Sequence, residues 1–127
     1  MVNLMKYRVL EEHFTNNAPE GTRLEVKNTF HYNVSFKQDG NRCIGLLKFD
    51  LHDQKEPDSF NMKLSIVADF TFGNESKAKI HQESFRQLFP YVRAIVTTLT
   101  TAAGMPALIL PCMEIKTDAE NSEQIEN

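Results

Sequence analysis

The hydrophobic period of the chain changes once, from that of a strand to that of a helix, and this change limits the fold most strongly. Residues 24–36 alternate between apolar and polar side chains, and residues 60–72 alternate equally well. A period of two is typical of half-buried strands. From Phe85 to Ala103, apolar side chains recur at steps of three and four, which predicts an amphipathic helix. Strands followed by one long helix indicate an α+β domain.

Two less regular segments are predicted to complete the sheet. One runs from Cys43 to His52, where Ile44 and Leu46 blur the alternation, and the other runs from Tyr7 to Phe14. The Asp-Gly pair inside 38–41 is typical of a tight hairpin turn between strands. We therefore predict a four-stranded antiparallel sheet with one apolar face, on which the helix packs, and one polar face.

The predicted helix is long and contains a proline. We expect it to begin near His81, because a cap at Ser76 would place Lys77 and Lys79 against the positive end of the helix dipole. The apolar stripe continues through Pro90, so the sequence predicts one kinked helix rather than two separate helices. Gly104, with a proline two residues later, is a typical helix end.

The far half of this helix carries no charge on its outer side, and residues 94–113 hold no charged side chain at all. Glycine and prolines interrupt the run and threonines dilute it, which disfavours a membrane span. We predict instead that a second subunit covers this side, with small side chains allowing close approach, at Ala94, Thr97 and Thr101. A solvated threonine-rich face in a monomer remains the alternative.

Composition and charge define the chain more broadly. With 127 residues, 41% of them hydrophobic and 24% charged, it is large enough for one globular domain. The net charge is −3, and five acids and one lysine fall within residues 114–127. We predict a domain over residues 1–115 and an acidic, flexible tail over residues 116–127. No basic stripe interleaved with aromatics is present, so nucleic-acid binding is not expected.

The sequence offers no catalytic, metal or cofactor motif. Neither GxxxxGK[ST] nor GxGxxG occurs, and the two cysteines have no metal-ligand spacing, which favours reduced thiols in a cytoplasmic protein. His31 and His52 could meet across a hairpin with Asp50, as an acid–base or metal site, although such side chains more often form the polar face of a sheet. We expect no enzyme and no cofactor.

The segment LFPYVRAIVTTLTTAAGMPALILP resembles the main helix and exit segment of SecB-type protein-export chaperones. The matching residues are Phe89, Pro90, Tyr91, Arg93, Gly104, Pro106 and Pro111. The resemblance implies a SecB-like domain with a four-stranded antiparallel sheet and a long helix, assembled as a dimer of dimers. It also implies ATP-independent binding of unfolded preproteins, which are passed to the SecA motor, or a role in toxin–antitoxin systems with a specialised client.

Within this interpretation, apolar side chains near strand ends are candidates for binding unfolded clients, although each of them singly fits a place in the core at least as well: Phe14, Tyr32, Val34 and Phe36. Glu11 and Glu12, the acidic pair of the first predicted strand, are candidates for a SecA-type partner. The competing hypothesis is a small-ligand binder or enzyme that uses the sheet–helix cavity. An enclosed pocket with His31 or His52 pointing into it would favour that alternative.

Overall fold

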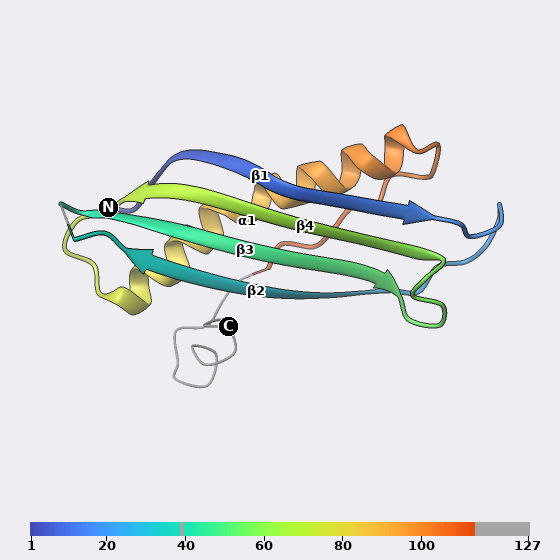
Figure 1. Ribbon diagram of the computed structural model, residues 1–127, viewed down its shortest axis with the longest axis horizontal. Coiled ribbons are helices and arrows are strands. Elements are labelled where there is room, and N and C mark those ends of the chain that lie inside the picture. The colour runs from blue at the N-terminus through green and yellow to red at the C-terminus, as the bar shows by residue number, and fades with distance from the viewer. Residues whose placement is uncertain (39, 114–127) are drawn as a thin grey trace.

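The computed structural model describes residues 1–38 and 40–113. One antiparallel sheet and one helix form two layers, and Figure 1 views the sheet from the side opposite the helix. The predicted flexible tail at residues 116–127 and the end of the predicted domain at residue 115 lie outside the described residues. The α+β architecture with four antiparallel strands and one long helix is confirmed.

The strands are β1 (Asn3–Asn16), β2 (Val26–Phe36), β3 (Arg42–Asp53) and β4 (Phe60–Thr71). They lie in the order β1-β4-β3-β2, and every neighbouring pair is antiparallel. Three consecutive strands thus form a meander, and β1 lies beside the last of them, which is a Greek-key order. The connection between β1 and β2 therefore passes from one edge of the sheet to the other, at one end of the sheet (Figure 1).

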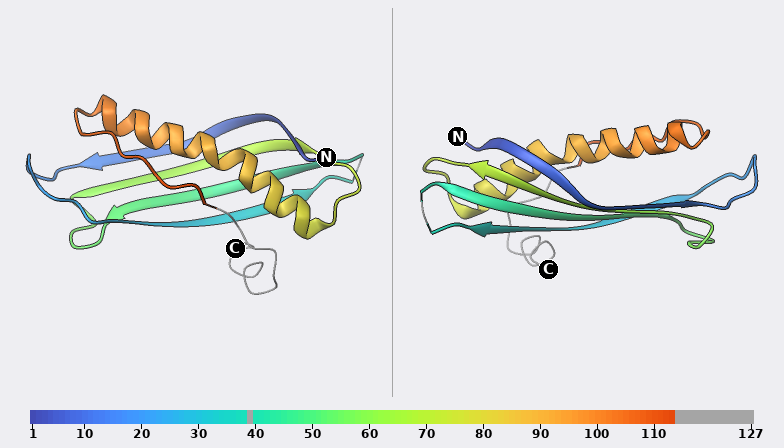
Figure 2. Two further views of the ribbon diagram at one scale, coloured as in Figure 1. Left: turned by 180° about the vertical axis from the view of Figure 1, so that it is seen from behind. Right: turned by 45° about the horizontal axis from the view of Figure 1, so that its top comes forward.

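Alternation along the strands divides the sheet into two faces. The buried positions of β3 and β4 are every second residue, from Cys43 to Asp53 and from Phe60 to Phe70. These side chains meet the helix α1 (Lys77–Ala102), which covers one face of the sheet (Figure 2). Ile44 and Leu46, which blur the pattern in the sequence, point to the other face and are half-buried there, where Leu46 pairs with Val67.

The helix begins earlier than the sequence predicted. It starts at Lys77 and not near His81, and the hydroxyl of the cap residue Ser76 accepts a hydrogen bond from the Lys79 N–H at 3.2 Å. Both lysines of the first turn have partners of their own. Lys79 pairs with Glu83 at 3.3 Å, and the Lys77 ammonium lies 5.3 Å from the centre of the Phe36 ring. These contacts, together with the serine cap, outweigh the unfavourable dipole interaction.

Pro90 does not interrupt the helix, which is continuous over 26 residues. Pro90 has no N–H to donate, and the helix axis bends along its length in Figures 1 and 2. The predicted single kinked helix is therefore confirmed. The bend lets the helix follow the twisted sheet while Phe89 and Val92, on either side of the proline, stay fully packed.

After Gly104, whose φ of 81° lies in the left-handed region, the chain returns along the helix. We call residues 105–113 the return segment. The Thr97 hydroxyl donates to the Leu108 carbonyl at 2.9 Å, and the Arg93 guanidinium donates to the Leu110 carbonyl at 2.8 Å. Leu110 is buried, whereas Ile109 is 71% exposed. The return segment thus covers part of the uncharged side of the helix that precedes it.

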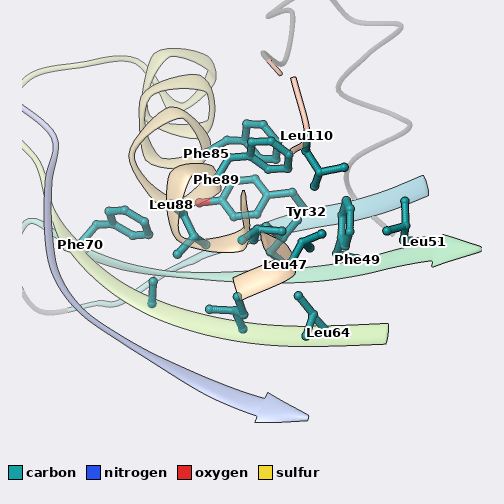
Figure 3. Close-up of a cluster of buried hydrophobic side chains, with 14 of the residues drawn as sticks. Tyr32, Leu47, Phe49, Leu51, Leu64, Phe70, Phe85, Leu88, Phe89 and Leu110 are labelled. Atoms are coloured by element: carbon teal, nitrogen blue, oxygen red, sulfur yellow. The ribbon is translucent and has the colours of Figure 1, made fainter. Parts of the chain in front are cut away.

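The core lies between α1 and the sheet and is rich in aromatic rings (Figure 3). Tyr32 is fully buried, and its hydroxyl donates to the Ser84 hydroxyl on the helix at 2.6 Å. The Tyr32 ring lies over Gly45, where a Cβ atom would collide with the phenol oxygen. A glycine inside a strand commonly marks such a close approach.

Candidate functional site

Exposed apolar side chains gather along β1 and the adjoining side of α1. Met5, Tyr7 and Leu10 on β1 are 63%, 40% and 51% exposed, and Tyr91 on the helix is 40% exposed. Large apolar side chains at a domain surface typically mark a binding site when they cluster. The edge of the sheet formed by β1 is therefore the main candidate for a binding surface.

A shallow groove of about 290 Å³ lies between β1 and α1. Its lining is mainly apolar and consists of Tyr7, Glu12, Tyr91, Ala94, Ile95, Thr98 and Leu99. We call it the β1–α1 groove. The rings of Tyr7 and Tyr91 lie side by side in this lining, with centroids 4.5 Å apart and planes tilted by 37°. Two exposed aromatic side chains beside aliphatic ones suit the capture of apolar side chains from another polypeptide.

Helical spacing and two strand irregularities create this groove. Tyr91, Ala94, Ile95 and Thr98 are three or four positions apart, so they share the side of α1 that flanks the core stripe. On β1, the register with β4 shifts at Met5 and again at Leu10. These bulges change which residues of β1 face the helix. Before the second shift the helix-facing residues are Tyr7 and Val9, and after it they are Glu12 and Phe14.

The start of β1 is held to the helix by one side chain. The Gln87 amide accepts from the Leu4 N–H at 2.7 Å and donates to the Val2 carbonyl at 2.6 Å. These two bonds take the place of the backbone hydrogen bonds that a neighbouring strand would form with this segment. Beyond this point, β1 is one of the two edge strands of the described sheet and pairs with β4 alone. Its other edge presents backbone donors and acceptors beside the groove.

The four residues predicted to bind clients occupy three different environments. Phe14 is half-buried on the helix-facing side of β1 and packs edge-to-face on Phe60 at 5.8 Å. Val34 and Phe36 lie at the far edge of the sheet, and Phe36 is 37% exposed and packs on Phe72. Tyr32 belongs to the core, since it is fully buried and hydrogen-bonded. Only Phe14 lies on the strand that forms the groove.

The predicted acidic pair is divided between the two faces. Glu11 pairs with Ser65 on the face away from the helix, whereas Glu12 pairs with Leu64 and lines the β1–α1 groove. The two carboxylates therefore do not form one docking surface. Of the predicted interface residues, Ala94 and Thr101 are exposed, while Thr97 contacts the return segment.

The histidine site considered from the sequence does not take the form of an enclosed pocket. His52 and Asp50 contact each other at 3.1 Å, and both line an open depression on the sheet face away from the helix. His31 lines a neighbouring depression on the same face. Among residues 1–38 and 40–113, no group of three or more histidine, cysteine, aspartate or glutamate side chains is arranged to hold a metal ion.

The two cysteines differ in environment. Cys43 is buried in the core, and burial raises the pKa of its thiol to about 11. Cys112 in the return segment is exposed, and the Arg93 guanidinium lies 3.2 Å from its sulfur.

In the described part of the chain, no helix is long and apolar enough to cross a membrane.

Comparison with known proteins gives matches in both sequence and structure. No family model matches the chain. The uncharacterized protein MJ0357 of Methanocaldococcus jannaschii is 27% identical over 125 residues, which cover 90% of this chain and 79% of the relative.

Two solved structures share the fold. One is the SecB-like chaperone Rv1957 of Mycobacterium tuberculosis in complex with a ChAD peptide from the HigA1 antitoxin. Its TM-score is 0.70 at 18% identity, with 88% of this chain and 87% of that chain covered. The other is a protein of unknown function from Streptococcus agalactiae, with a TM-score of 0.51 at 15% identity and coverage of 87% and 97%. The chain therefore has a SecB-like fold, as the sequence resemblance implied.

Proposed function

We propose that this SecB-like protein is an ATP-independent chaperone, a holdase, and that clients bind in the β1–α1 groove. The observation that carries the proposal is the mainly apolar lining of the groove, in which the contacting rings of Tyr7 and Tyr91 are both 40% exposed. The fold neighbour from M. tuberculosis supports it, because that chaperone was solved with a peptide bound.

Capture in this groove needs no covalent chemistry. An unfolded segment would bury its apolar side chains against Tyr7, Tyr91 and Ile95, which contributes about 25 cal/mol for each Å² removed from water. The outer edge of β1 can add main-chain hydrogen bonds to an extended segment, and such bonds are independent of the client's sequence. Glu12 at the rim favours clients with a basic or polar residue beside the apolar ones.

The sequence candidates fit this proposal unequally. Phe14 would extend the binding surface along β1, since it faces the same side of the sheet as Tyr7 and Glu12. Val34 and Phe36 would form a second, smaller contact surface at the β2 edge, where Lys77 stacks on the Phe36 ring. Tyr32 contributes indirectly, because its bond to Ser84 fixes the helix that carries Tyr91.

For the client, a specialised partner of the antitoxin kind is favoured over bulk preproteins. The fold neighbour holds an antitoxin peptide. The predicted SecA contact has less support, because Glu11 and Glu12 lie on opposite faces of the sheet. The ligand-binding or enzymatic alternative is not favoured, since the histidines that it requires line open depressions.

We further propose a cytoplasmic homo-oligomer, a dimer of dimers. The exposed stripe formed by Ala94, Thr98 and Thr101 is uncharged and made of small side chains, which allow two helices to approach closely. Ala94 and Thr98 also line the β1–α1 groove, so this contact would place the groove at the subunit boundary. An assembly of this kind would join several β1–α1 grooves into a longer binding surface. A long client could then be held at several points at once.

The experiment that tests the function is aggregation of a denatured model client, such as chemically unfolded citrate synthase, on dilution without ATP. The expected result is suppressed light scattering at stoichiometric amounts of the protein, unchanged when ATP is added. Lysozyme at equal mass serves as the control for unspecific protection. Unchanged scattering over a range of client sequences, including an antitoxin segment, would contradict the proposal.

A further inference from the structure

The sheet face that points away from α1 differs in charge from the rest of the chain. We call it the open face (Figure 1). Register places six lysine and arginine side chains there and only three carboxylates. The bases are Lys6, Arg8, Lys27, Arg42, Lys48 and Lys63, and the acids are Glu11, Asp50 and Asp69. The open face therefore has an excess of positive charge, although the whole chain has a net charge of −3.

The carboxylates of the open face are already engaged with neighbours. Asp69 lies 3.7 Å from the Lys6 ammonium, and Asp50 lies 3.1 Å from the His52 ring. Glu11 lies 3.7 Å from His13. In the described part of the chain, the ion pairs of lysines involve Lys6, Lys55 and Lys79, and neither Lys48 nor Lys63 lies within ion-pair distance of a carboxylate.

Lys48 and Lys63 border the same depression, of about 230 Å³. They are diagonal neighbours, since Lys48 pairs with Ser65 and Lys63 pairs with Asp50. Thr29 and Ser65 add hydroxyl groups to the lining, His31 adds a ring nitrogen, and Glu11 and Asp50 add carboxylates. The positive excess therefore belongs to the open face as a whole, and Lys48 and Lys63 are two of its six basic side chains. Lys63 also borders the next depression along the face, so the cationic region is not confined to one point.

A small apolar patch adjoins this region. Leu46 and Val67 face each other across β3 and β4, and Ile44 lies two residues farther along β3. All three are half-buried on the open face. A ligand that fits the whole face therefore combines negative charges with a few apolar groups at one end.

We propose that the open face docks an acidic, extended segment of a partner polypeptide, with glutamate or aspartate at Lys48 and Lys63 and an apolar flank on Leu46 and Val67. The face of an antiparallel sheet accommodates an extended chain, and carboxylates are natural partners for lysine. Single-stranded nucleic acid fits less well, because the open-face positions of the four strands carry no phenylalanine or tyrosine on which bases would stack.

This partner is distinct from the client of the β1–α1 groove, since the open face lies on the other side of the sheet (Figure 2). The inference does not rest on the proposed holdase function. The two can fail separately, because one is read by peptide binding and the other by suppression of aggregation.

The test is fluorescence polarisation with a labelled peptide in which six glutamates alternate with serines, followed by two leucines. The full chain should bind it at low salt and lose affinity as salt rises, since charges at a surface are screened over about 8–10 Å at physiological ionic strength. Lys48→Glu with Lys63→Glu should weaken binding by at least about tenfold. Lys48→Gln with Lys63→Gln should give an intermediate loss and shows that the effect is not one of misfolding.

The matched control is Lys77→Glu with Lys79→Glu, the same charge change on the helix, which should leave peptide affinity unchanged. Equal binding of a peptide with glutamine in place of glutamate would overturn the proposal. So would equal affinity of the Lys48/Lys63 variants, or preference for single-stranded DNA or phosphatidylserine vesicles. Tighter peptide binding after deletion of residues 114–127 would assign the face to the acidic end of this chain and overturn a partner in trans.

Discussion

The ring of Tyr7 on β1 lies 4.5 Å from the ring of Tyr91 on α1, and each side chain is 40% exposed. This contact joins the outer strand of the sheet to the outer side of the helix. Aromatic pairs that keep part of their surface in water are poised to gain a third apolar partner. The pair is therefore the natural centre of a surface that captures unfolded segments.

Replacing both rings with Tyr7→Ser and Tyr91→Ser should lower client capacity. Loss of an aromatic anchor typically weakens binding by about 1–2 kcal/mol, which corresponds to roughly tenfold in Kd. Light scattering of a denatured client, titrated with the variant, measures the change. Ile109→Ser is the matched control, because Ile109 is 71% exposed but lies on the return segment. Equal losses in the variant and the control would argue against a defined groove.

A second prediction concerns assembly. Ala94→Lys with Thr101→Lys should shift the protein to a smaller assembly in chromatography with light scattering, because a symmetric contact would bring like charges together. A buried charge without a partner costs several kcal/mol. Thr97→Lys is less informative than the sequence suggested, since Thr97 bonds to the return segment. An unchanged molar mass, or a wild type that is already monomeric, would exclude this interface.

The tyrosine in the core gives a prediction about stability. Tyr32→Phe removes the bond to Ser84 and should lower the free energy of unfolding by about 0.5–1.5 kcal/mol, measured by urea denaturation. Gly45→Ala should lower the free energy of unfolding by more, about 1–3 kcal/mol, because the added Cβ meets the tyrosine hydroxyl. In a protein that already carries Tyr32→Phe, the loss caused by Gly45→Ala should be smaller than in the wild type. Additive effects would contradict the close approach.

Thiol reactivity should separate the two cysteines. The native protein should react rapidly at Cys112 and slowly at Cys43, because Cys43 is buried and its pKa is raised to about 11, which keeps it protonated at pH 8. Ellman's reagent should titrate one thiol in the native state and two in denaturant. Cys112→Ser should abolish the rapid phase, and rapid reaction of that variant would show that the core opens readily.

The carboxylate of Asp53 makes stability depend on pH. Backbone N–H groups of Glu25, at 2.8 Å, and Glu56, at 3.0 Å, donate to it, and these bonds hold its pKa below the ordinary value. A lowered pKa in the folded state stabilises the fold above the unfolded value of about 3.9, and this contribution is lost as the pH falls through the folded pKa. Asp53→Asn should therefore lower the urea midpoint at pH 6, and the difference should shrink as the pH falls through the lowered pKa of Asp53. A constant difference would point to a purely steric effect.

Much of the fold could be predicted because apolar and polar side chains alternate along the strands, whereas apolar side chains recur at steps of three and four along the helix. Residues 60–72 and 24–36 show their buried faces directly, and the boundaries differ from the structure by two residues or fewer. β1 looked shorter and weaker in the sequence, since the bulge at Leu10 moves the helix-facing positions from Tyr7 and Val9 to Glu12 and Phe14. A pattern that changes parity within one strand resembles noise when only the sequence is read.

The candidate site was harder to predict for the same reason. The β1–α1 groove depends on the bulged strand and on the flank of the helix, so Tyr7 was not recognised and Tyr91 was noted only as part of a motif. Tyr91 does carry a signal, because it is an aromatic side chain outside the apolar stripe of the helix. Tyr32 is a predicted client-binding residue for which the core is an equal alternative, and the structure places it in the core over Gly45. Their contact depends on strand register, which neither residue reveals alone.

The unequal distribution of charge between the open face and the rest of the molecule gives the protomer an electric dipole across the plane of the sheet. In an ion-exchange experiment such a molecule does not behave as its net charge of −3 suggests. At neutral pH and low salt, the open face can adsorb to a negatively charged resin while the acidic remainder stays toward the buffer. A protein that is acidic as a whole would then be retained on a cation exchanger in one fixed orientation.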